Sequence, residues 1–247
     1  MNRAVMATIL LSPPIERPLA LSVAQGGLPV AVDLRGQQGP PFRQRVAGVQ
    51  TREQRVPVAP TADVAIVGAG YTGLSAAITL ARAGRSVAVF DKMRPGEGAS
   101  TRNGGIASGN LTPSFQQLID KLGQDRAQSI QAEARAARED LMQFIRAENL
   151  ACDFALTGRF TGASNAGDYD RLAREADLLS KHIGVDAYAL PRAEQKAALG
   201  TDFYHGGLVR MDIGGLHPAK FHAEMLRVAL AAGATVHGET AVLKITR

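Results

Sequence analysis

Three glycines in G-x-G-x-x-G spacing constrain this chain of 247 residues more than any other feature: Gly68, Gly70 and Gly73. A short apolar run, Val64–Val67, precedes them, and an alanine-rich segment follows them. A second apolar run, Val87–Phe90, comes next. A strand, a glycine turn, a helix and a second strand make a βαβ unit, and this glycine spacing is typical of units that bind a dinucleotide.

Each glycine is expected to have its own task. The first permits a tight turn, the second lets bare backbone approach a pyrophosphate, and the third allows close contact of helix and strand. The N-terminus of the helix offers free N–H groups and a positive dipole end to the phosphates. Asp91 ends the second strand, 21 residues after Gly70. Its carboxylate can accept hydrogen bonds from an adenosine ribose, so the unit is expected to bind an ADP moiety.

The segments around the turn support this interpretation. Val64–Val67 is short and apolar, which favours a parallel strand buried on both faces. The helix has apolar residues on one side and Gly84 at its C-terminal end, where glycine stops helices. The alternative at this point is a βαβ unit that binds nothing.

The segment Arg94–Thr112 distinguishes between the two common dinucleotides. In a nicotinamide-binding domain, another helix and strand would follow soon after the second strand. This chain instead has a loop rich in glycine and small polar residues, in which Arg102 and Asn103 supply hydrogen-bond donors. The loop favours FAD, while a nicotinamide-binding protein and a flexible surface loop are the alternatives.

At these motifs the chain resembles the D-amino-acid-oxidase-like superfamily of FAD-dependent oxidoreductases. The likeness is greatest to the branch that contains gamma-glutamylputrescine oxidase and related amine or amino-acid oxidases. It runs from about residue 60 to the last residue. The matching stretches are Ala62–Phe90, Gly98–Gly105, Tyr204–Gly207, Gly215–Phe221 and Gly233–Ile245.

The resemblance implies an α/β fold: a Rossmann-like FAD-binding domain with a partial inserted substrate domain. It divides the chain into a leader at 1–61 and an oxidoreductase domain at 62–247. FAD-binding parts are expected at 62–112 and about 215–247, with a partial substrate or cap region at about 113–214. Family members are considerably longer, so the chain is expected to be an N-terminal portion whose fold is incomplete at its C-terminal side.

The resemblance also implies which residues contact FAD. The glycine turn would hold the pyrophosphate and Asp91 the ribose. Residues of the later segments would contact the phosphate and ribityl region, the isoalloxazine ring and the adenine. The full set is Gly68, Gly70, Tyr71, Thr72, Gly73, Asp91, Ala99, Ser100, Arg102, Asn103, Gly104, Gly105 and Val242. Some relatives attach flavin through a histidine in the loop at 98–105, but this chain has Arg102 there, so non-covalent FAD is expected.

The implied activity is oxidation of the C–N bond of an amine or amino acid, with a hydride equivalent passing to the flavin N5. The cofactor carries the chemistry, so no catalytic acid or base is named. The alternative is a truncated, non-catalytic remnant that keeps the ADP-binding motif.

Composition excludes several other classes. Residues 1–61 carry seven arginines and three acidic residues, whereas residues 62–247 carry 21 basic and 20 acidic residues. The leader is therefore expected to be a disordered basic extension. The nearly balanced charge of the domain does not indicate nucleic-acid binding. Cys152 is the single cysteine and is expected to be buried, and the five histidines lack ligand spacing, so no metal is expected. No apolar run is long enough to span a membrane, and a cytoplasmic location is expected.

The middle of the chain predicts alternating helices and strands. Thr112-Pro113 is expected to open a helix to Leu122, and His217-Pro218 a helix to Ala232. The other expected helices are 125–149, 168–183 and 191–199, and the expected strands are 154–160, 187–190, 208–212, 235–237 and 241–246. Thr235–His237 would complete a parallel sheet of about three strands, leaving Val64–Val67 as an exposed edge. The isolated chain is therefore expected to be poorly soluble or weakly loaded with flavin.

Overall fold

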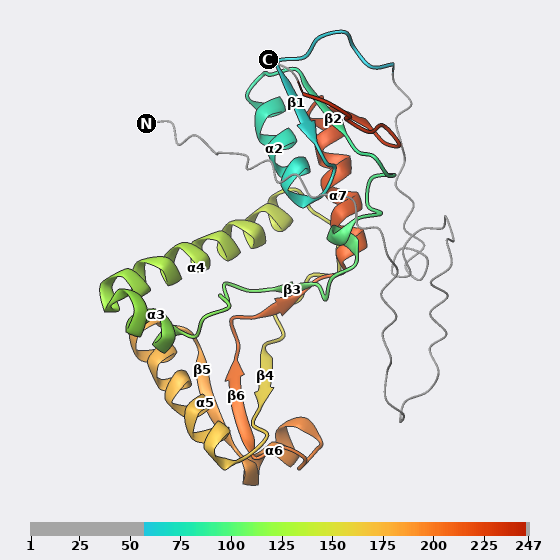
Figure 1. Cartoon of the computed structure of the whole chain (residues 1–247). Helices are drawn as coiled ribbons and strands as arrows, with labels where there is room; N and C mark the ends of the chain where they lie inside the picture. Colours follow the sequence, from blue (N-terminus) through green and yellow to red (C-terminus); the bar gives the residue numbers. More distant parts are fainter. Residues whose placement is uncertain (1–56, 246–247) are drawn as a thin grey trace. The chain divides into compact units, whose positions relative to one another are not determined.

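The structure is a computed structural model that describes residues 57–245. The expected disorder of the leader concerns residues that lie almost wholly outside this range. Within the described residues the chain combines helices with one parallel and two antiparallel sheets (Figure 1). This is the mixed α/β class that the sequence predicts.

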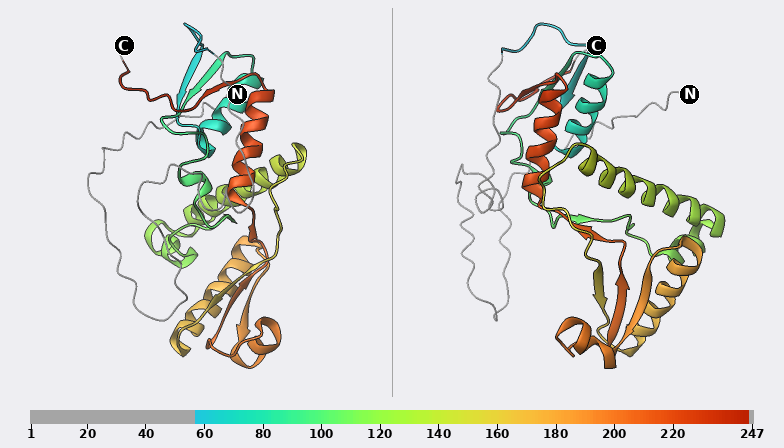
Figure 2. Two further views of the ribbon diagram at one scale, coloured as in Figure 1. Left: turned by 90° about the vertical axis from the view of Figure 1, so that its right-hand side faces the viewer. Right: turned by 180° about the vertical axis from the view of Figure 1, so that it is seen from behind.

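The parallel sheet contains the strands that the βαβ motif predicts. Its order is β1 (Val64–Val67), β2 (Val87–Phe90) and β8 (Thr235–His237), and both strand pairs are parallel. Two helices, α2 (Tyr71–Arg82) and α7 (Pro218–Ala231), lie beside each other along this sheet (Figures 1 and 2). The sequence prediction that the strand at 235–237 joins the parallel sheet is therefore confirmed.

The core of this part forms where α2 and α7 cover one face of the sheet. Apolar side chains of both helices pack on alternate residues of β2 and β8. The buried members include Leu74, Ala77 and Ile78 of α2, Val87 and Val89 of β2, Phe221, Met225, Leu226 and Val228 of α7, and Val236 of β8. This core joins residues about 150 positions apart in sequence, and it fixes the glycine turn between β1 and α2.

Burial of β1 differs from the sequence prediction. The strand alternates between half-buried and exposed residues, and Val67 is 56% exposed. The expectation that Val64–Val67 is buried on both faces is therefore wrong. The reason is topological: β1 is the edge of the sheet in the described part of the chain, and the helices cover one face only.

A second sheet lies in the region predicted as the cap. It is antiparallel in the order β4 (Arg159–Gly162), β6 (Gly206–Arg210) and β5 (Ala187–Pro191). A separate buried cluster joins it to helices through residues such as Phe115, Leu172, Ala176, Leu179 and Leu208. The helices of this region are α3 (Phe115–Leu122), α4 (Gln124–Ala147), α5 (Ala166–Leu178) with its π-helical end η2 (Leu179–Ile183), and α6 (Arg192–Leu199).

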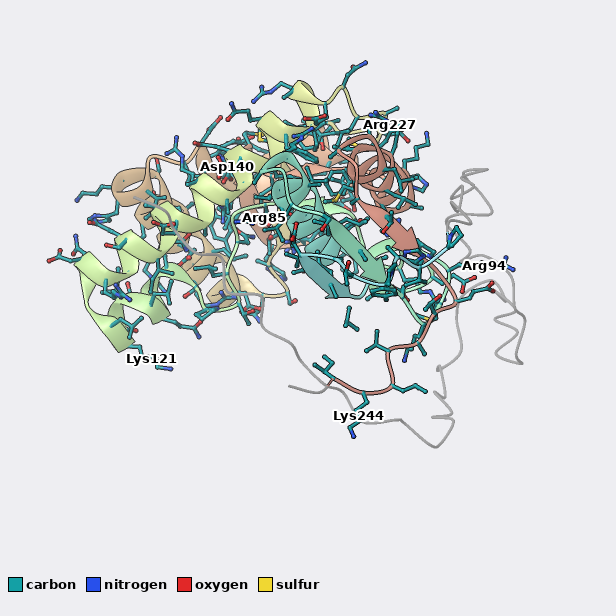
Figure 3. The ribbon with its side chains drawn as sticks, turned by 90° about the horizontal axis from the view of Figure 1, so that it is seen from above. Arg85, Arg94, Lys121, Asp140, Arg227 and Lys244 are labelled. Atoms are coloured by element: carbon teal, nitrogen blue, oxygen red, sulfur yellow. The ribbon has the colours of Figure 1, made fainter. Side chains whose placement is uncertain are left out.

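Two short strands and one helical turn lie between these regions. The 3-10 turn η1 (Ala99–Thr101) is followed by β3 (Ile106–Ala107), which pairs antiparallel with β7 (Gly214–Gly215). The segment Arg94–Thr112 is thus mostly loop, as expected. Charged side chains such as Lys121 and Arg227 are exposed and point away from the ribbon (Figure 3).

Several predicted boundaries are wrong. The first cap-region helix begins at Phe115 instead of 113, because Ser114 and Gln117 form a capping box. The strand expected at 154–160 lies at 159–162, and Ala155 forms an isolated bridge with Gly215 instead. The strand expected at 208–212 lies at 206–210.

The end of the chain differs most from the sequence prediction. Residues 241–245 contain no strand, and Thr246 lies outside the described residues. Leu243 is 93% exposed, and no neighbouring strand among residues 57–245 supplies backbone partners for this segment. An apolar segment with high strand propensity forms a strand only where a partner is present.

Candidate cofactor-binding site

The glycine turn has the geometry that its sequence predicts. Gly68 has a φ of +100°, and its N–H donates to the carbonyl oxygen of Phe90 at 2.7 Å. A Cβ atom on Gly73 would lie 1.9 Å from the carbonyl oxygen of Gly68. The first glycine therefore supplies a left-handed backbone conformation, and the third lets α2 approach the turn. No atom lies within 4 Å of the Cβ position of Gly68, so bare main chain faces open space there.

The loop after β2 closes over the N-terminus of α2. The hydroxyl oxygen of Ser100 accepts a hydrogen bond of 3.1 Å from the backbone N–H of Tyr71. A Cβ atom on Gly70 would lie 2.9 Å from that oxygen. Within residues 57–245, the N–H groups of Thr72 and Gly73 have no hydrogen-bond partner, and these are the orphan donors that a helix start presents to an anion.

Asp91 lies against the turn, as the βαβ motif predicts. Its Oδ2 atom accepts a hydrogen bond of 2.8 Å from the N–H of Ala69, and its Oδ1 atom accepts one of 2.9 Å from Met93. An ionised carboxylate has about four acceptor positions. Each oxygen of Asp91 can therefore accept one further bond, for example from a sugar hydroxyl.

His222 also holds the turn, and the sequence analysis did not identify it. This residue of α7 is fully buried, and its Nε2 atom lies 2.7 Å from the carbonyl oxygen of Ala69. A carbonyl oxygen only accepts, so Nε2 carries the proton. The buried Nδ1 atom has no partner within the described part of the chain. Burial lowers the pKa of His222, because it disfavours the charged imidazolium.

Tyr71 connects α2 to the start of α7. Its ring meets that of Phe221 edge to face, with centroids 5.2 Å apart, and its hydroxyl donates to the carbonyl oxygen of Pro218 at 3.0 Å. Burial raises the pKa of the Tyr71 hydroxyl. The side chain of Tyr71 therefore joins the two helices, while its backbone lies at the turn.

The loop at 99–105 is shaped by the side chain of Asn103. Its amide nitrogen donates to the carbonyl oxygen of Ser100 at 2.9 Å, and its amide oxygen accepts from the N–H of Gly105 at 2.9 Å. Gly105 has a φ of +73°, and a Cβ atom there would lie 2.1 Å from the carbonyl oxygen of Leu216. The backbone N–H of Arg102 donates to the carbonyl oxygen of Ala99 at 3.0 Å, while its exposed side chain has no partner among residues 57–245. Asn103 thus fixes the loop, and Arg102 is available to a ligand.

The structure brings most of the predicted site residues together. The turn at 68–73, Asp91 and Ser100 share direct hydrogen bonds or close contacts. The chain after β8 also returns to this corner, because Thr240 donates to the carbonyl oxygen of Asp91 at 2.7 Å. Val242, two residues later, is 40% exposed and has no hydrogen bond to the corner within the described range.

These observations fit the adenosine diphosphate half of FAD. A turn without side chains, two free helical amides and a carboxylate with spare acceptors face one corner at the carboxyl ends of β1 and β2. Diphosphates bind at helix N-termini through such amides, and parallel sheets bind ligands at this edge.

A family comparison identifies the chain. A family model described as "FAD dependent oxidoreductase" (DAO) matches residues 63–247. The chain belongs to this family. FAD is the family's cofactor, so the ADP moiety predicted from the glycine spacing is that of FAD. The prediction of a D-amino-acid-oxidase-like protein is confirmed.

Curated relatives support the same assignment. The chain is 32% identical over 187 residues to a probable oxidoreductase OrdL of Rhizobium meliloti, which covers 75% of this chain and 44% of the relative. It is 30% identical over 158 residues to the gamma-glutamylputrescine oxidoreductase of Escherichia coli, which covers 64% of this chain and 37% of the relative. The chain therefore spans less than half the length of these relatives.

Solved structures show the same fold. The glycine oxidase of Geobacillus kaustophilus aligns with a TM-score of 0.62 and 23% identity, over 75% of this chain and 48% of that chain. An L-amino acid deaminase of Proteus vulgaris aligns with a TM-score of 0.58 and 22% identity, over 77% of this chain and 47% of that chain. The incomplete FAD-binding fold predicted from the sequence agrees with these coverages.

Other predicted features can be compared with the described residues. Cys152 is fully buried, as expected, and burial raises the pKa of its thiol. No helix among residues 57–245 is long and apolar enough to cross a membrane. In the same range, no three His, Cys, Asp or Glu side chains are grouped as a metal site would need.

Proposed function

We propose that this protein is an FAD-dependent oxidoreductase that oxidises the C–N bond of an amine or amino acid. The observation that carries the proposal is the corner around Ala69. Its N–H is held by Asp91 and its carbonyl oxygen by His222, at 2.8 Å and 2.7 Å. The two flanking glycines and the free amides of α2 are thereby presented to one ligand.

The cofactor-binding residues are proposed from this geometry and from the family. The turn would hold the pyrophosphate, Asp91 the ribose, and the loop at 98–105 the ribityl chain and ring. The proposed set remains Gly68, Gly70, Tyr71, Thr72, Gly73, Asp91, Ala99, Ser100, Arg102, Asn103, Gly104, Gly105 and Val242. FAD would be bound without a covalent link, since Arg102 occupies the place of the histidine that some relatives use.

The substrate would contact one face of the cap sheet. Phe160, Val209 and Tyr188 are paired across β4, β6 and β5, so their side chains share a face opposite that of the buried Leu208. The ring of Tyr204 lies over Gly162, where a Cβ atom would be 2.3 Å from it. Aromatic rings attract substituted ammonium groups, which suits an amine or amino-acid substrate.

The protein's own part in the reaction is binding and orientation. FAD, when bound, would supply the acceptor, at its flavin N5, for a hydride equivalent from the amine-bearing carbon of the substrate. Asn103 and Gly105 hold the loop that would lie beside the ring, and Arg102 supplies a positive charge there. We assign no residue as acid or base.

A second candidate function is FAD binding without turnover. The chain spans 44% and 37% of the length of two curated relatives, so FAD binding and turnover by this chain are tested separately.

The experiment is anaerobic mixing of the FAD-loaded chain with primary and secondary amines and amino acids. Loss of the cofactor's own absorbance band at ~450 nm, followed by peroxide release in air, supports oxidoreductase activity. Stable flavin absorbance with every substrate supports binding alone.

A further inference from the structure

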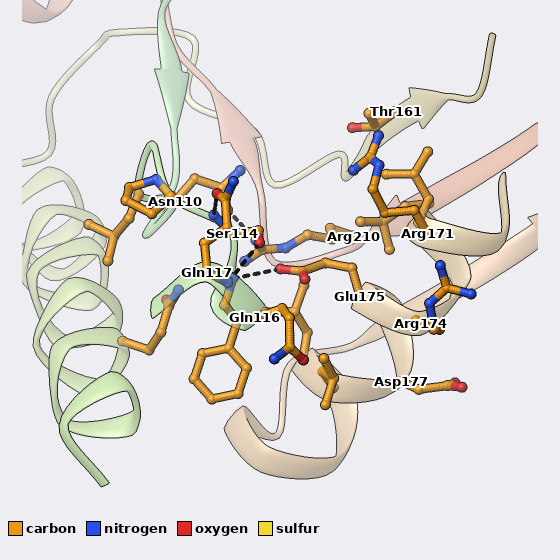
Figure 4. Close-up of a pocket in the computed structure, with 18 of the residues that line it drawn as sticks. Asn110, Ser114, Gln116, Gln117, Thr161, Arg171, Arg174, Glu175, Asp177 and Arg210 are labelled. Carbon is orange, nitrogen blue, oxygen red and sulfur yellow. Dashed lines mark hydrogen bonds between the residues drawn. The ribbon is translucent and has the colours of Figure 1, made fainter. Parts of the chain in front are cut away.

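A groove of about 930 Å³ lies in the cap region, between α5, β4, β6 and the segment at 110–117 (Figure 4). Its apolar floor includes Leu208 of β6 and Leu172 of α5, which belong to the buried cluster of the cap. The groove is therefore on the helical face of the cap sheet, opposite the face that carries Phe160 and Tyr188. None of the proposed FAD-binding residues lines it.

Positive charge is concentrated in this groove. Five cationic side chains line it against two carboxylates, a net charge of +3: Arg159, Arg171, Arg174, Lys181 and Arg210 against Glu175 and Asp177. The whole of residues 62–247 has a net charge of only +1. In the described part of the chain, Arg159, Arg174 and Lys181 have no ion-pair partner within 4.0 Å. These three side chains therefore carry the positive charge of the groove that no carboxylate pairs with.

Carboxylates next to the groove pair with two of these cations, at 3.5 Å between Asp168 and Arg171 and at 2.8 Å between Asp212 and Arg210. The Oε1 atom of Glu175 already accepts a hydrogen bond of 2.9 Å from the N–H of Phe115. In Figure 4 the side chain of Asp177 points away from Arg210 and Ser114. Asp212 is shared by two guanidinium groups, at 2.8 Å from Arg210 and 2.7 Å from Arg138. Arg138 also lies 3.5 Å from Glu139, so two carboxylates face these two cations.

A buried amide also faces this groove without a partner. Gln131 of α4 lines the groove and is 7% exposed, and its side chain has no hydrogen bond to any residue between 57 and 245. Its amide atoms keep some exposure, which is to the groove, so solvent there can be their partner. A ligand with acceptor oxygens could take the place of that solvent.

We propose that this groove binds a small organic anion with carboxylate or phosphate oxygens. Arg210 is held in place by Asp212 and by Asn110, whose amide oxygen it contacts, and it keeps further N–H donors for an anion. Arg171 supplies a second, exposed guanidinium, and Gln131 supplies amide donors. Guanidinium groups bind carboxylates and phosphates in pairs of hydrogen bonds. The site is independent of FAD binding and of amine oxidation.

Isothermal titration of the full chain, first without FAD and then with saturating FAD, tests this proposal. Citrate and inorganic phosphate are separate probes at constant ionic strength. We expect at least one probe to bind. Arg171→Gln should weaken that binding about tenfold or more, the loss typical of one charge-assisted contact. Arg126→Gln, an exposed arginine of α4 outside the groove, is the control and should bind as the unaltered chain does.

Gln131→Met separates a binding role from a structural one. Methionine has a similar shape and no amide, so the melting temperature without an anion should stay the same or rise, while the affinity for the anion falls. Three results would overturn the proposal: no binding of either probe, equal affinity of the Arg171 and Arg126 variants, or loss of binding when FAD is added. The last result would place the anion at the glycine turn instead.

Discussion

The Nε2 atom of His222 donates a hydrogen bond of 2.7 Å to the carbonyl oxygen of Ala69, 153 residues earlier in the chain. On the other side of the same residue, Asp91 accepts from the N–H of Ala69. The middle residue of the glycine turn is thus held by two elements that lie far apart in sequence.

Replacing His222 with leucine should loosen the glycine turn. The carbonyl oxygen of Ala69 would lose its buried partner, which costs about 1–3 kcal/mol. We expect a lower free energy of unfolding and weaker FAD binding, measured by urea unfolding and by flavin titration. His222→Gln is the matched control, because a glutamine amide can place a donor where Nε2 lies. Equal losses in both variants would argue against the hydrogen bond as the cause.

His222 should also make stability depend on pH. Its pKa in the folded state is below the ordinary value of 6.5, so the unfolded chain binds more protons just below that pH. The contribution of neutral His222 to the free energy of unfolding is therefore complete above pH 6.5, and it is lost as the pH falls through the range below that value. The melting temperature should fall between about pH 7.5 and about pH 5.5, and should fall less in His222→Gln. The pKa values of Asp63 and Glu139 are also lowered, but these carboxyl groups change stability only at more acidic pH. A pH dependence unchanged in the glutamine variant would contradict this prediction.

Gly73 should tolerate no side chain. The Cβ atom of Gly73→Ala would lie 1.9 Å from the carbonyl oxygen of Gly68, which forces α2 away from the turn. We expect a loss of about 3 kcal/mol or more in the free energy of unfolding. Gly84→Ala is the control, since Gly84 has a φ of +78° but no atom within 4 Å of its Cβ position. It should cost only about 1 kcal/mol. Similar losses at both positions, measured by chemical unfolding, would show that the close approach is unimportant.

Asp91→Ala should weaken FAD retention. The change removes the acceptor of the N–H groups of Ala69 and Met93 and the proposed acceptor of the ribose hydroxyls. We expect the dissociation constant for FAD to rise about tenfold or more, which corresponds to about 1.4 kcal/mol. Asp91→Asn keeps one acceptor oxygen and should show a smaller loss in the same flavin titration. Unchanged affinity in the alanine variant would count against the assignment of Asp91.

The exposed edge of the parallel sheet should promote association. Val67 on β1 is 56% exposed, and the unpaired edge of an apolar strand is a template for pairing with another chain. We expect the isolated chain to be poorly soluble or weakly loaded with flavin, and Val67→Lys to reduce association in size-exclusion chromatography. A soluble, monomeric, fully flavin-loaded chain would contradict the prediction.

The sequence predicts the βαβ unit well because its signals are local. The glycine spacing sets the turn between β1 and α2, and the short apolar runs set β1, β2 and β8. Strand burial was overestimated at Val64–Val67, because the coverage of a strand depends on its neighbours rather than on its own residues. The same reason explains the missing strand at 241–245.

Contacts between distant segments could not be predicted from the sequence. No local pattern shows that His222 reaches Ala69 or that Ser100 caps Tyr71. Two of the cap strands, β4 and β6, begin two to five residues from their predicted starts, whereas β5 lies close to the predicted 187–190. The positions of β4 and β6 depend on glycines at which neighbouring groups approach closely. Gly207 is one of these: its Cβ atom would lie 2.3 Å from the carbonyl oxygen of Thr161.

We propose that the turn from Gly68 to Gly73 holds the diphosphate of FAD, and competition between ligands at this one site is the decisive measurement. FAD fluorescence is followed in the full chain as ADP or riboflavin is added. We expect ADP to displace FAD, because both present a diphosphate to the amides of α2, and riboflavin, which has no phosphate, to displace it far less. Displacement by riboflavin but not by ADP, or no FAD binding at all, would rule out this role of the turn.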